Sequence, residues 1–362
     1  MGYLRCFMKK LLLAILMLSV LNAFAQKDSV TVSLYVEPYY SGHSQIYSDG
    51  KNHDCVVPIY SYSRKSEFNL NLGLIRLKYK NSDVRANISL GVGTYMQANY
   101  SNEPIGAQNI FEANVGAKIS KKHNLWVDAG VLPSHIGFES AVGTDNFTLS
   151  RSVVADNSPY YETGARLSLT SKNNKWFFAG FVLNGWQNIY KVDQDLKPSV
   201  GHQITFTPNE KTTINWSSFV GNVPVGNIFR LRTYSNLYAI VKLSSKWDVI
   251  GGFDVGFQRQ NKIVYNPWYA GVIMARRTLN DKWKACLRSE VFIDEEQIIV
   301  QSRVDRRVHI IATSLNFDRK FSERMVWRTE LRVFLADEKF FDAPRDGYYV
   351  HRMLTTSWAF TF

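Results

Sequence analysis

The sequence predicts an all-β protein, an up-and-down antiparallel transmembrane β-barrel of about sixteen strands, with fourteen or eighteen strands left open. Three observations lead to this prediction. The chain ends in an aromatic strand with one apolar face, it begins with an export signal, and its short turns alternate with long loops. We therefore assign residues 1–25 to a cleaved signal peptide and residues 26–362 to the barrel.

The last thirteen residues alternate between two faces of a strand. One face is mostly apolar and aromatic and carries Leu354, Thr356, Trp358, Phe360 and Phe362. A soluble domain seldom leaves such a strand free, because an exposed edge invites aggregation. A lipid-facing strand requires this pattern. Trp358, Phe360 and Phe362 also resemble the C-terminal signal of outer-membrane barrels, which makes the barrel assembly machinery an expected partner.

The N-terminus has the three regions of a secretory signal peptide in order. A positively charged segment ends at Lys10, an apolar segment ends at Leu21, and an A-x-A cleavage site ends at Ala25. The apolar segment is too short to span a bilayer as a helix. Together with the C-terminal strand, this predicts the outer membrane of a Gram-negative bacterium as the location.

Between the two ends, period-2 segments are separated by two kinds of connection, as in Val84–Val92, where apolar and polar residues alternate. The short turns are 80–83, 120–124, 171–175, 208–211, 244–246, 279–282 and a longer one at 318–324. The long loops are 41–67, 97–109, 133–162, 187–198, 221–231, 260–267, 294–308 and 336–349. Bacterial barrels have periplasmic turns and external loops, so this pattern predicts that both termini are periplasmic.

The tryptophans support the same orientation. Six of the nine follow a short turn or lie near the C-terminus, namely Trp126, Trp176, Trp247, Trp283, Trp327 and Trp358. An aromatic belt at the periplasmic interface would place them at one level. In a soluble β-sandwich they would instead be scattered through the core.

The charge of the exported chain limits its partners. The full chain has a net charge of +12, and removal of three positive and no negative residues with the signal peptide leaves +9. In the cytoplasm such an excess would indicate nucleic acid, but after export no nucleic-acid partner is expected. Outer-membrane lipid, lipopolysaccharide and anionic solutes are the expected partners.

The connection at 133–162 is the longest and combines turn-forming residues with apolar anchors. Loops of this length are usually functional or disordered, and the anchors favour an ordered loop that folds inward. We predict that it narrows the lumen, with His135, Glu139, Asp145, Arg151 and Asp156 as its polar residues. The alternative is an extracellular flap.

A barrel of sixteen strands is too wide for side chains to fill, which predicts a water-filled lumen. Parity with the apolar faces assigns nine charged residues to the pore lining: Arg85, Lys118, Asp128, Arg166, Arg288, Glu290, Arg328, Glu330 and Arg332. Rings of Arg and Lys favour anions, and arginines opposite an acidic loop would create a transverse field that orients polar solutes. Paired charges that only stabilise the wall are the alternative.

Three runs carry a more specific resemblance: VLPSHIGFES at 131–140, TLSRS at 148–152 and ADNSPYYETGARLS at 155–168. They resemble the OmpL-like β-barrel porins that are common in Bacteroidetes. The resemblance implies a porin-like barrel and no particular substrate. We expect small hydrophilic solutes to diffuse through it, and the overall positive charge predicts a mild anion preference. General porins further imply, by analogy, a homotrimer, although a monomer remains open.

Two other functions remain open, a channel selective for anions, sugars or peptides and a non-transport scaffold in an envelope complex. The sequence does not predict an enzyme, a metal or a cofactor, because the histidines form no HExxH or comparable pair. The cluster His53-Asp54-Cys55 is weak evidence for a metal site. Cys55 and Cys286 could form a disulfide after export, but their pairing does not follow from sequence.

Overall fold

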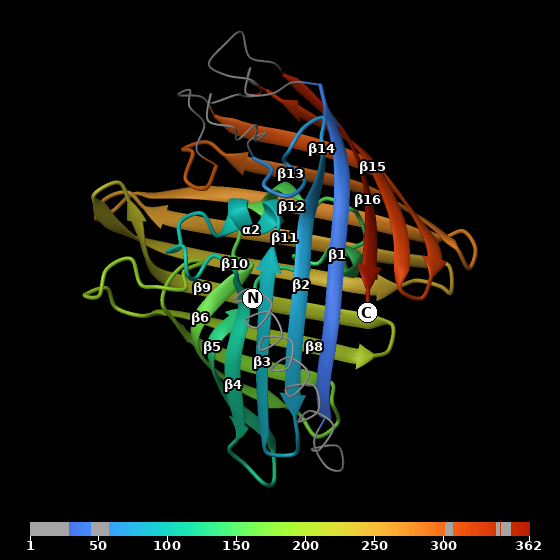
Figure 1. Ribbon diagram of the computed structural model, residues 1–362. Helices are drawn as coiled ribbons and strands as arrows, with labels where there is room; N and C mark the ends of the chain where they lie inside the picture. The colour runs from blue at the N-terminus through green and yellow to red at the C-terminus, as the bar shows by residue number, and fades with distance from the viewer. Residues whose placement is uncertain (1–28, 45–57, 301–306, 338–340, 342–348) are drawn as a thin grey trace, which may run out of the picture.

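The computed structural model describes residues 29–44, 58–300, 307–337, 341 and 349–362. Sixteen antiparallel strands form a closed barrel, in which β1 pairs with both β2 and β16 (Figure 1). This confirms the predicted fold class and strand number. The predicted signal peptide lies outside the described residues, as does Cys55, whereas Cys286 is buried and free.

Consecutive strands are neighbours all around the barrel. Their bounds are β1 Ser29–His43, β2 Phe68–Lys80, β3 Val84–Val92, β4 Ile110–Lys118, β5 Asn124–Pro133, β6 Tyr161–Thr170, β7 Trp176–Leu183, β8 Ser199–Asn209, β9 Thr212–Val225, β10 Ile228–Lys242, β11 Trp247–Arg259, β12 Tyr265–Thr278, β13 Trp283–Asp294, β14 Val308–Ser322, β15 Met325–Ala336 and β16 Val350–Thr361. Among the described residues, three short helices lie in the connections: α2 Thr94–Asn99, η2 Gly143–Asp145 and α3 Val153–Asp156. In the described chain no helix is long and apolar enough to cross a membrane.

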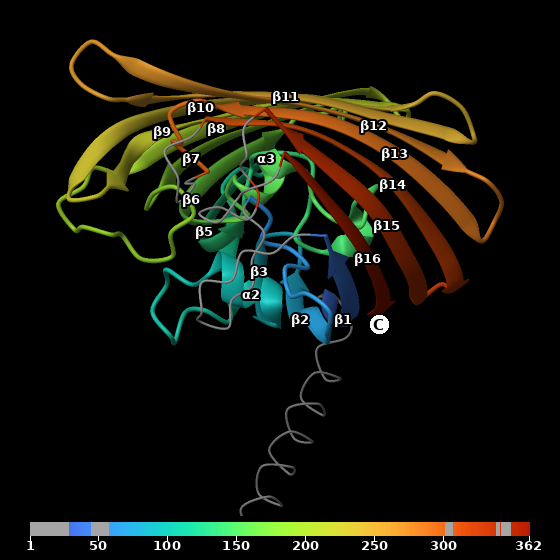
Figure 2. The ribbon, with the colours of Figure 1, turned by 90° about the horizontal axis from the view of Figure 1, so that it is seen from above.

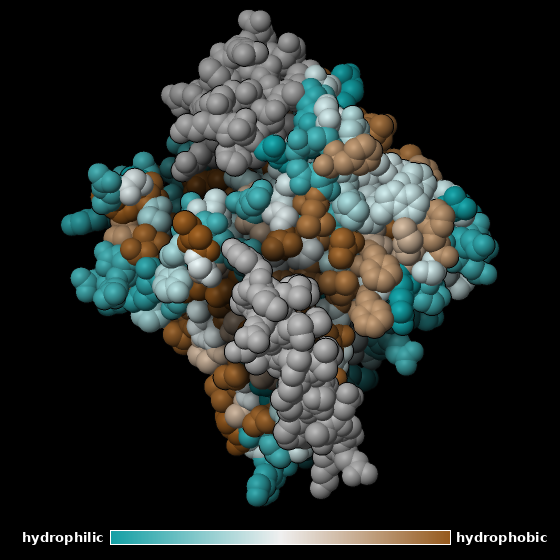
Figure 3. All heavy atoms as spheres, viewed as in Figure 1, coloured by the Kyte–Doolittle hydropathy of each residue, from teal (hydrophilic) through white to brown (hydrophobic). Residues whose placement is uncertain are grey.

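The strands have two different faces, as the alternation predicts. In β16, Leu354 and Trp358 are 57% and 40% exposed, whereas Met353 and Thr355 are fully buried. The same division recurs in other strands, so the outer wall is apolar and suited to lipid. Figure 3 shows hydrophobic side chains over the strand wall and hydrophilic residues at the hairpin ends.

The connections alternate as predicted, with two corrections. The loop expected at 221–231 is a tight hairpin, because β9 continues to Val225, β10 begins at Ile228, and these two residues pair. Gly226 has φ +58°, which a two-residue hairpin turn requires and which glycine adopts without strain. The turn expected at 318–324 is also shorter, because β14 extends to Ser322. We call the end of the barrel with the short turns the turn end and the opposite end the loop end.

The interior is more filled than strand number alone predicts. Apolar side chains that point inward from one side of the barrel form a buried cluster, which includes Phe219, Trp268, Met274, Phe292, Phe334 and Met353. Ile136, Val153 and Val154, from the connection between β5 and β6, pack into the same cluster. The folded connection therefore packs against apolar side chains that point into the barrel.

Candidate functional site

The connection between β5 and β6 is the central feature of the interior. We call residues 134–160 the inner segment. In Figure 2, α3 of this segment lies between the strands β11–β13 and the wall formed by β2 and β3. Its local fold is set by short polar side chains, because Ser152 caps α3 by accepting a hydrogen bond from the Ala155 amide at 3.2 Å. Asn146 similarly accepts from the Ser140 amide at 2.7 Å.

The start of the inner segment is held by His135. Its Nδ1 lies 2.7 Å from Glu162 Oε2, and its Nε2 lies 2.8 Å from the backbone oxygen of Ser218 on β9. Burial lowers the pKa of His135, but the charge and hydrogen bond of Glu162 outweigh this effect and the pKa is raised. A protonated ring donates from both nitrogens to these two acceptors. Ser217 donates back to the His135 carbonyl at 2.7 Å, and Phe181 stacks on the ring. His135 therefore fixes the segment to β6 and β9.

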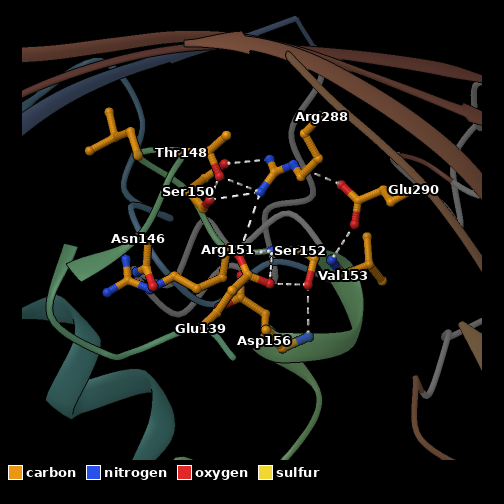
Figure 4. A network of polar contacts seen from close by, with 12 residues as sticks. Glu139, Asn146, Thr148, Ser150, Arg151, Ser152, Val153, Asp156, Arg288 and Glu290 are labelled. Atoms are coloured by element: carbon orange, nitrogen blue, oxygen red, sulfur yellow. Dashed lines mark hydrogen bonds and ion pairs between the residues drawn. The ribbon is translucent and has the colours of Figure 1, made fainter. Parts of the chain in front are cut away.

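The middle of the inner segment is held by Arg288 on β13 (Figure 4). The guanidinium donates to Thr148 Oγ1 at 3.0 Å, to the Ser150 carbonyl at 2.7 Å and to Ser150 Oγ at 3.0 Å. It also donates to Glu330 Oε1 at 2.8 Å. Glu330 in turn accepts from the Ser150 amide at 2.6 Å. The ion pair of Arg288 and Glu330 thus provides hydrogen-bond partners for the amide, the carbonyl and the hydroxyl of Ser150.

Two further ion pairs act in the same way. Arg328 donates to the carbonyls of Gly143 and Asn146 and pairs with Asp318 at 2.7 Å. Arg332 donates to the Arg151 carbonyl at 2.7 Å and pairs with Glu290. Glu290 accepts from the Val153 amide at 2.6 Å. The arginines bind backbone carbonyls of the segment, and Glu290 and Glu330 bind its backbone amides. These charged side chains therefore satisfy backbone groups that a helix or sheet would otherwise pair.

These contacts change the role of the predicted pore-lining residues. Arg288, Glu330 and Arg332 are 0% exposed, Arg328 is 1% and Glu290 is 5%. They point inward, but they contact the inner segment rather than solvent. Their charge is also neutralised locally by the ion pairs, so these arginines do not form an open strip facing the lumen.

The remaining predicted lining residues lie elsewhere in the barrel. The Asp128 carboxylate bridges Arg85 at 2.6 Å and Arg166 at 3.0 Å, and these two arginine side chains stay 25% and 23% exposed. Lys118 ends β4 near the turn end and lies on the same face as Glu112 and Asn114. The charges of this half of the barrel are thus partly solvated.

The polar residues predicted for the constriction do not form one group. Glu139 accepts from the Ser152 amide at 3.0 Å and lies 3.8 Å from Arg288. Arg151 donates to the Ser140 carbonyl and to Tyr62, and its guanidinium lies 5.4 Å from the Tyr62 ring. The Asp156 carboxylate accepts from Ser61 at 2.8 Å. Asp145, in contrast, is exposed.

Sequence reasoning did not identify several of these partners. Tyr62 and Ser61 lie in the connection between β1 and β2, and Tyr95 lies in α2, 5.9 Å from Arg151. Alternation assigns a face only to strand residues, so it gives no signal for these side chains. The sequence could have predicted that Asp318 points inward, because the period-2 pattern extended from Asn316 places it on the inward face of β14.

Two polar hollows lie at opposite ends of the inner segment. The loop-end hollow encloses about 380 Å³ and is lined by Asp156, Asn157, Trp186 and Arg232, among others. The turn-end hollow encloses about 370 Å³ and is lined by Thr144, Asn146, Lys284 and Asp318, among others. Each hollow includes residues of the inner segment. The segment therefore lies between a space near the loops and a space near the turns.

Comparison with known proteins agrees with this architecture. A family model described as "Putative beta-barrel porin-2, OmpL-like" matches residues 29–362. The chain belongs to this porin family. It is accordingly an outer-membrane porin channel, and family and fold indicate a channel rather than an enzyme. Among curated proteins, none matches the sequence.

Solved porins share the fold at low sequence identity. The anion-selective porin from Comamonas acidovorans matches with a TM-score of 0.61 and 10% identity, over 93% of this chain and 100% of that one. The trimer form of OmpT from Vibrio cholerae has a TM-score of 0.58 and 8% identity, over 93% and 100%. OmpF of Salmonella typhi in complex with daunomycin has a TM-score of 0.57 and 10% identity, over 93% and 98%.

The attachment of the inner segment is expected to weaken as pH rises. Burial raises the pKa of Glu139 from 4.5 to about 7, although the Arg288 guanidinium and the Ser152 hydrogen bonds oppose this shift, and Glu290 raises it further. The folded state therefore holds a proton that the unfolded state releases, and stability falls as pH rises from about 4.5 to about 7, by roughly 3 kcal/mol at most. We expect channel current noise to be greater at pH 8 than at pH 5.

A neutral isostere tests this assignment. Glu139→Gln should remove most of the pH dependence of the current noise, because the amide does not titrate. Asp145→Asn, at an exposed position of the same segment, should retain it. An unchanged pH dependence in the Glu139→Gln protein would show that another group is responsible.

Proposed function

We propose that small hydrophilic solutes diffuse through this porin and that the inner segment forms the narrowest part of their path. The observation that carries the proposal is the position of the segment between the two polar hollows, with its start and its middle fixed to the wall. A solute that crosses the barrel must pass beside it. The buried ion pairs of Arg288, Arg328 and Arg332 keep the segment in place.

The filled interior supports a narrow path rather than a wide one. Aromatic side chains such as Phe219, Trp268 and Phe292 occupy space that water would fill in an open barrel of this strand number. This favours solutes of small cross-section. It also makes a substrate-selective channel the second candidate function.

Charge in the turn-end hollow supports a mild preference for anions. Three basic residues of its lining, Arg276, Lys320 and Arg328, pair with carboxylates. The lining also includes Lys282, Lys284 and Arg324, against the acidic Asp281. Basic linings favour anions in pores. In this proposal the selectivity arises at the turn end, since the buried arginines of the wall are already paired.

The arrangement in the membrane is also part of the proposal. Strand β1 begins and strand β16 ends at the end with short turns, which in bacterial barrels is periplasmic. Trp358, Phe360 and Phe362 would form the signal for the assembly machinery, and the loop end would face lipopolysaccharide. The trimeric porin neighbour supports a homotrimer, and the resemblance of residues 131–168 to porins common in Bacteroidetes supports an origin in that group.

The experiment is a planar-bilayer recording of the refolded protein under a salt gradient. We expect steady single-channel conductance and a reversal potential that favours anions. A cation-favouring reversal potential would refute the selectivity, while the porin function would stand. No conductance from correctly folded protein would refute diffusion through this barrel and favour the scaffold function.

A further inference from the structure

Arg232 in the loop-end hollow differs from the other buried arginines. It lies on β10, is only 8% exposed, and its guanidinium is 5.1 Å from the Trp186 ring and 5.6 Å from the Trp268 ring. Two aromatic faces therefore hold the cation in a dry position. Such a position is costly for a charge unless a partner compensates the lost hydration.

No carboxylate that the structure describes forms an ion pair with Arg232. Asp294 of β13 interacts with it electrostatically, but that carboxylate already accepts from the amides of Ile298, Ile299 and Val300. Nε and Nη2 of Arg232 both donate to one neutral oxygen, Gln258 Oε1, at 3.2 and 2.7 Å. By comparison, Arg288, Arg328 and Arg332 each pair with a carboxylate. Among the described residues nothing accepts a hydrogen bond from Arg232 Nη1. A buried guanidinium with an unused donor thus borders a polar hollow.

Two amide side chains that line the hollow, those of Asn99 and Asn157, can act as acceptors. The side-chain nitrogen of Asn99 donates to the Tyr95 carbonyl, and that of Asn157 donates to the carbonyls of Pro58 and Val153. In the described part of the chain, no donor is bonded to either side-chain oxygen. These oxygens are neutral, so hydroxyl groups match them better than ammonium groups do.

Asp156 is acidic and lines the same hollow, but its carboxylate does not make the hollow favour cationic ligands. Its two oxygens already accept from Ser61 Oγ at 2.8 Å, from Tyr160 Oη at 3.2 Å and from the Tyr60 amide at 3.3 Å. Three donors of the chain therefore compensate this carboxylate. The hollow combines one free cationic donor, neutral acceptors and the Trp186 ring.

We propose that the loop-end hollow binds small hydroxylated carboxylates, that is, sugar acids. The carboxylate would bind Nη1 of Arg232, and the hydroxyls would donate to Asn99 and Asn157. The ligand's ring would pack near Trp186. The enclosed volume of about 380 Å³ is at the lower end of the range for small-molecule sites. This proposal names the solute class of the channel and, in that respect, rests on the proposed function.

The test measures binding separately from conduction. Refolded protein in detergent is titrated with D-glucuronate by isothermal calorimetry, with acetate and D-glucose as probes that each lack one half of the ligand chemistry. We expect saturable glucuronate binding and at least tenfold weaker binding of both partial probes. Arg232→Gln should weaken glucuronate binding at least tenfold, because it removes the one cationic side chain among the described residues that line the hollow.

Arg259→Gln is the matched control, since Arg259 is an exposed arginine at the loop end of β11 that does not line the hollow. It should bind glucuronate as the wild type does. If Arg232→Gln does not fold, Asn99→Asp should weaken binding by placing a negative charge among the acceptors. Equal binding of acetate or glucose, or an Arg232→Gln protein that binds normally, would overturn the proposal.

Conductance separates the two proposals. A conducting barrel without saturable glucuronate binding would overturn the sugar-acid site and leave the porin function intact. Saturable binding without conductance would retain the site and overturn diffusion. In a conducting barrel, glucuronate added on the loop side should reduce the current more in the wild type than in Arg232→Gln.

Discussion

Arg288→Ala is expected to loosen the inner segment without opening the barrel wall. The substitution removes four hydrogen bonds of the guanidinium, to Thr148, to two atoms of Ser150 and to Glu330. It also leaves Glu330 with one cationic partner fewer in a buried environment. Breaking a buried ion pair from one side costs about 3–5 kcal/mol. Strand pairing of β13 should survive, because it depends on the backbone.

The measurement is single-channel recording at neutral pH. The Arg288→Ala channel should fluctuate between levels and have a higher mean conductance than the steady wild type. Arg352→Ala is the control, because Arg352 is an exposed arginine of β16. It should behave as the wild type. Identical recordings for Arg288→Ala and the wild type would mean that the ion pair does not hold the segment.

Deleting residues 143–157 and joining the ends with a short Gly/Ser linker should widen the path. The barrel is expected to fold, because the wall charges keep partners within the wall. Arg288 pairs with Glu330 at 2.8 Å, Arg328 with Asp318 at 2.7 Å, and Arg332 with Glu290. Water would then hydrate these pairs where the segment had covered them.

Liposome swelling with sugars of increasing size measures this effect. Liposomes with the deletion protein should swell in oligosaccharides that the wild type excludes. The size limit should rise by at least one sugar unit. A deletion protein with the correct fold and the same size limit would place the narrowest part of the path elsewhere, for example at the aromatic cluster around Trp268.

The strand pattern could be predicted because it depends on local alternation. Leu287 is 54% exposed and Arg288 is fully buried, as the parity of β13 requires. The prediction of a long loop at 221–231 was wrong for the same reason, because it relied on local sequence. Gly221 and Pro224 are typical of loops, but both lie within β9, and Pro224 pairs with Phe229 of β10. Neighbouring strands override a weak local preference.

The role of the inward charges could not be predicted from alternation. Parity places Arg332 inside, yet only the folded inner segment determines that it meets the Arg151 carbonyl, which is 181 positions away in the chain. The contact between Arg151 and the Tyr62 ring likewise depends on the folded segment and could not be predicted from alternation. The sequence predicted which residues face the lumen, whereas what occupies the lumen depends on long-range contacts.

The central claim is that this barrel conducts and that the inner segment limits the conducting path. The most direct test compares single-channel conductance of the wild type and the 143–157 deletion in the same bilayer and salt. Our account predicts a steady wild-type conductance and a clearly larger one for the deletion. Equal conductance of the two proteins would contradict it.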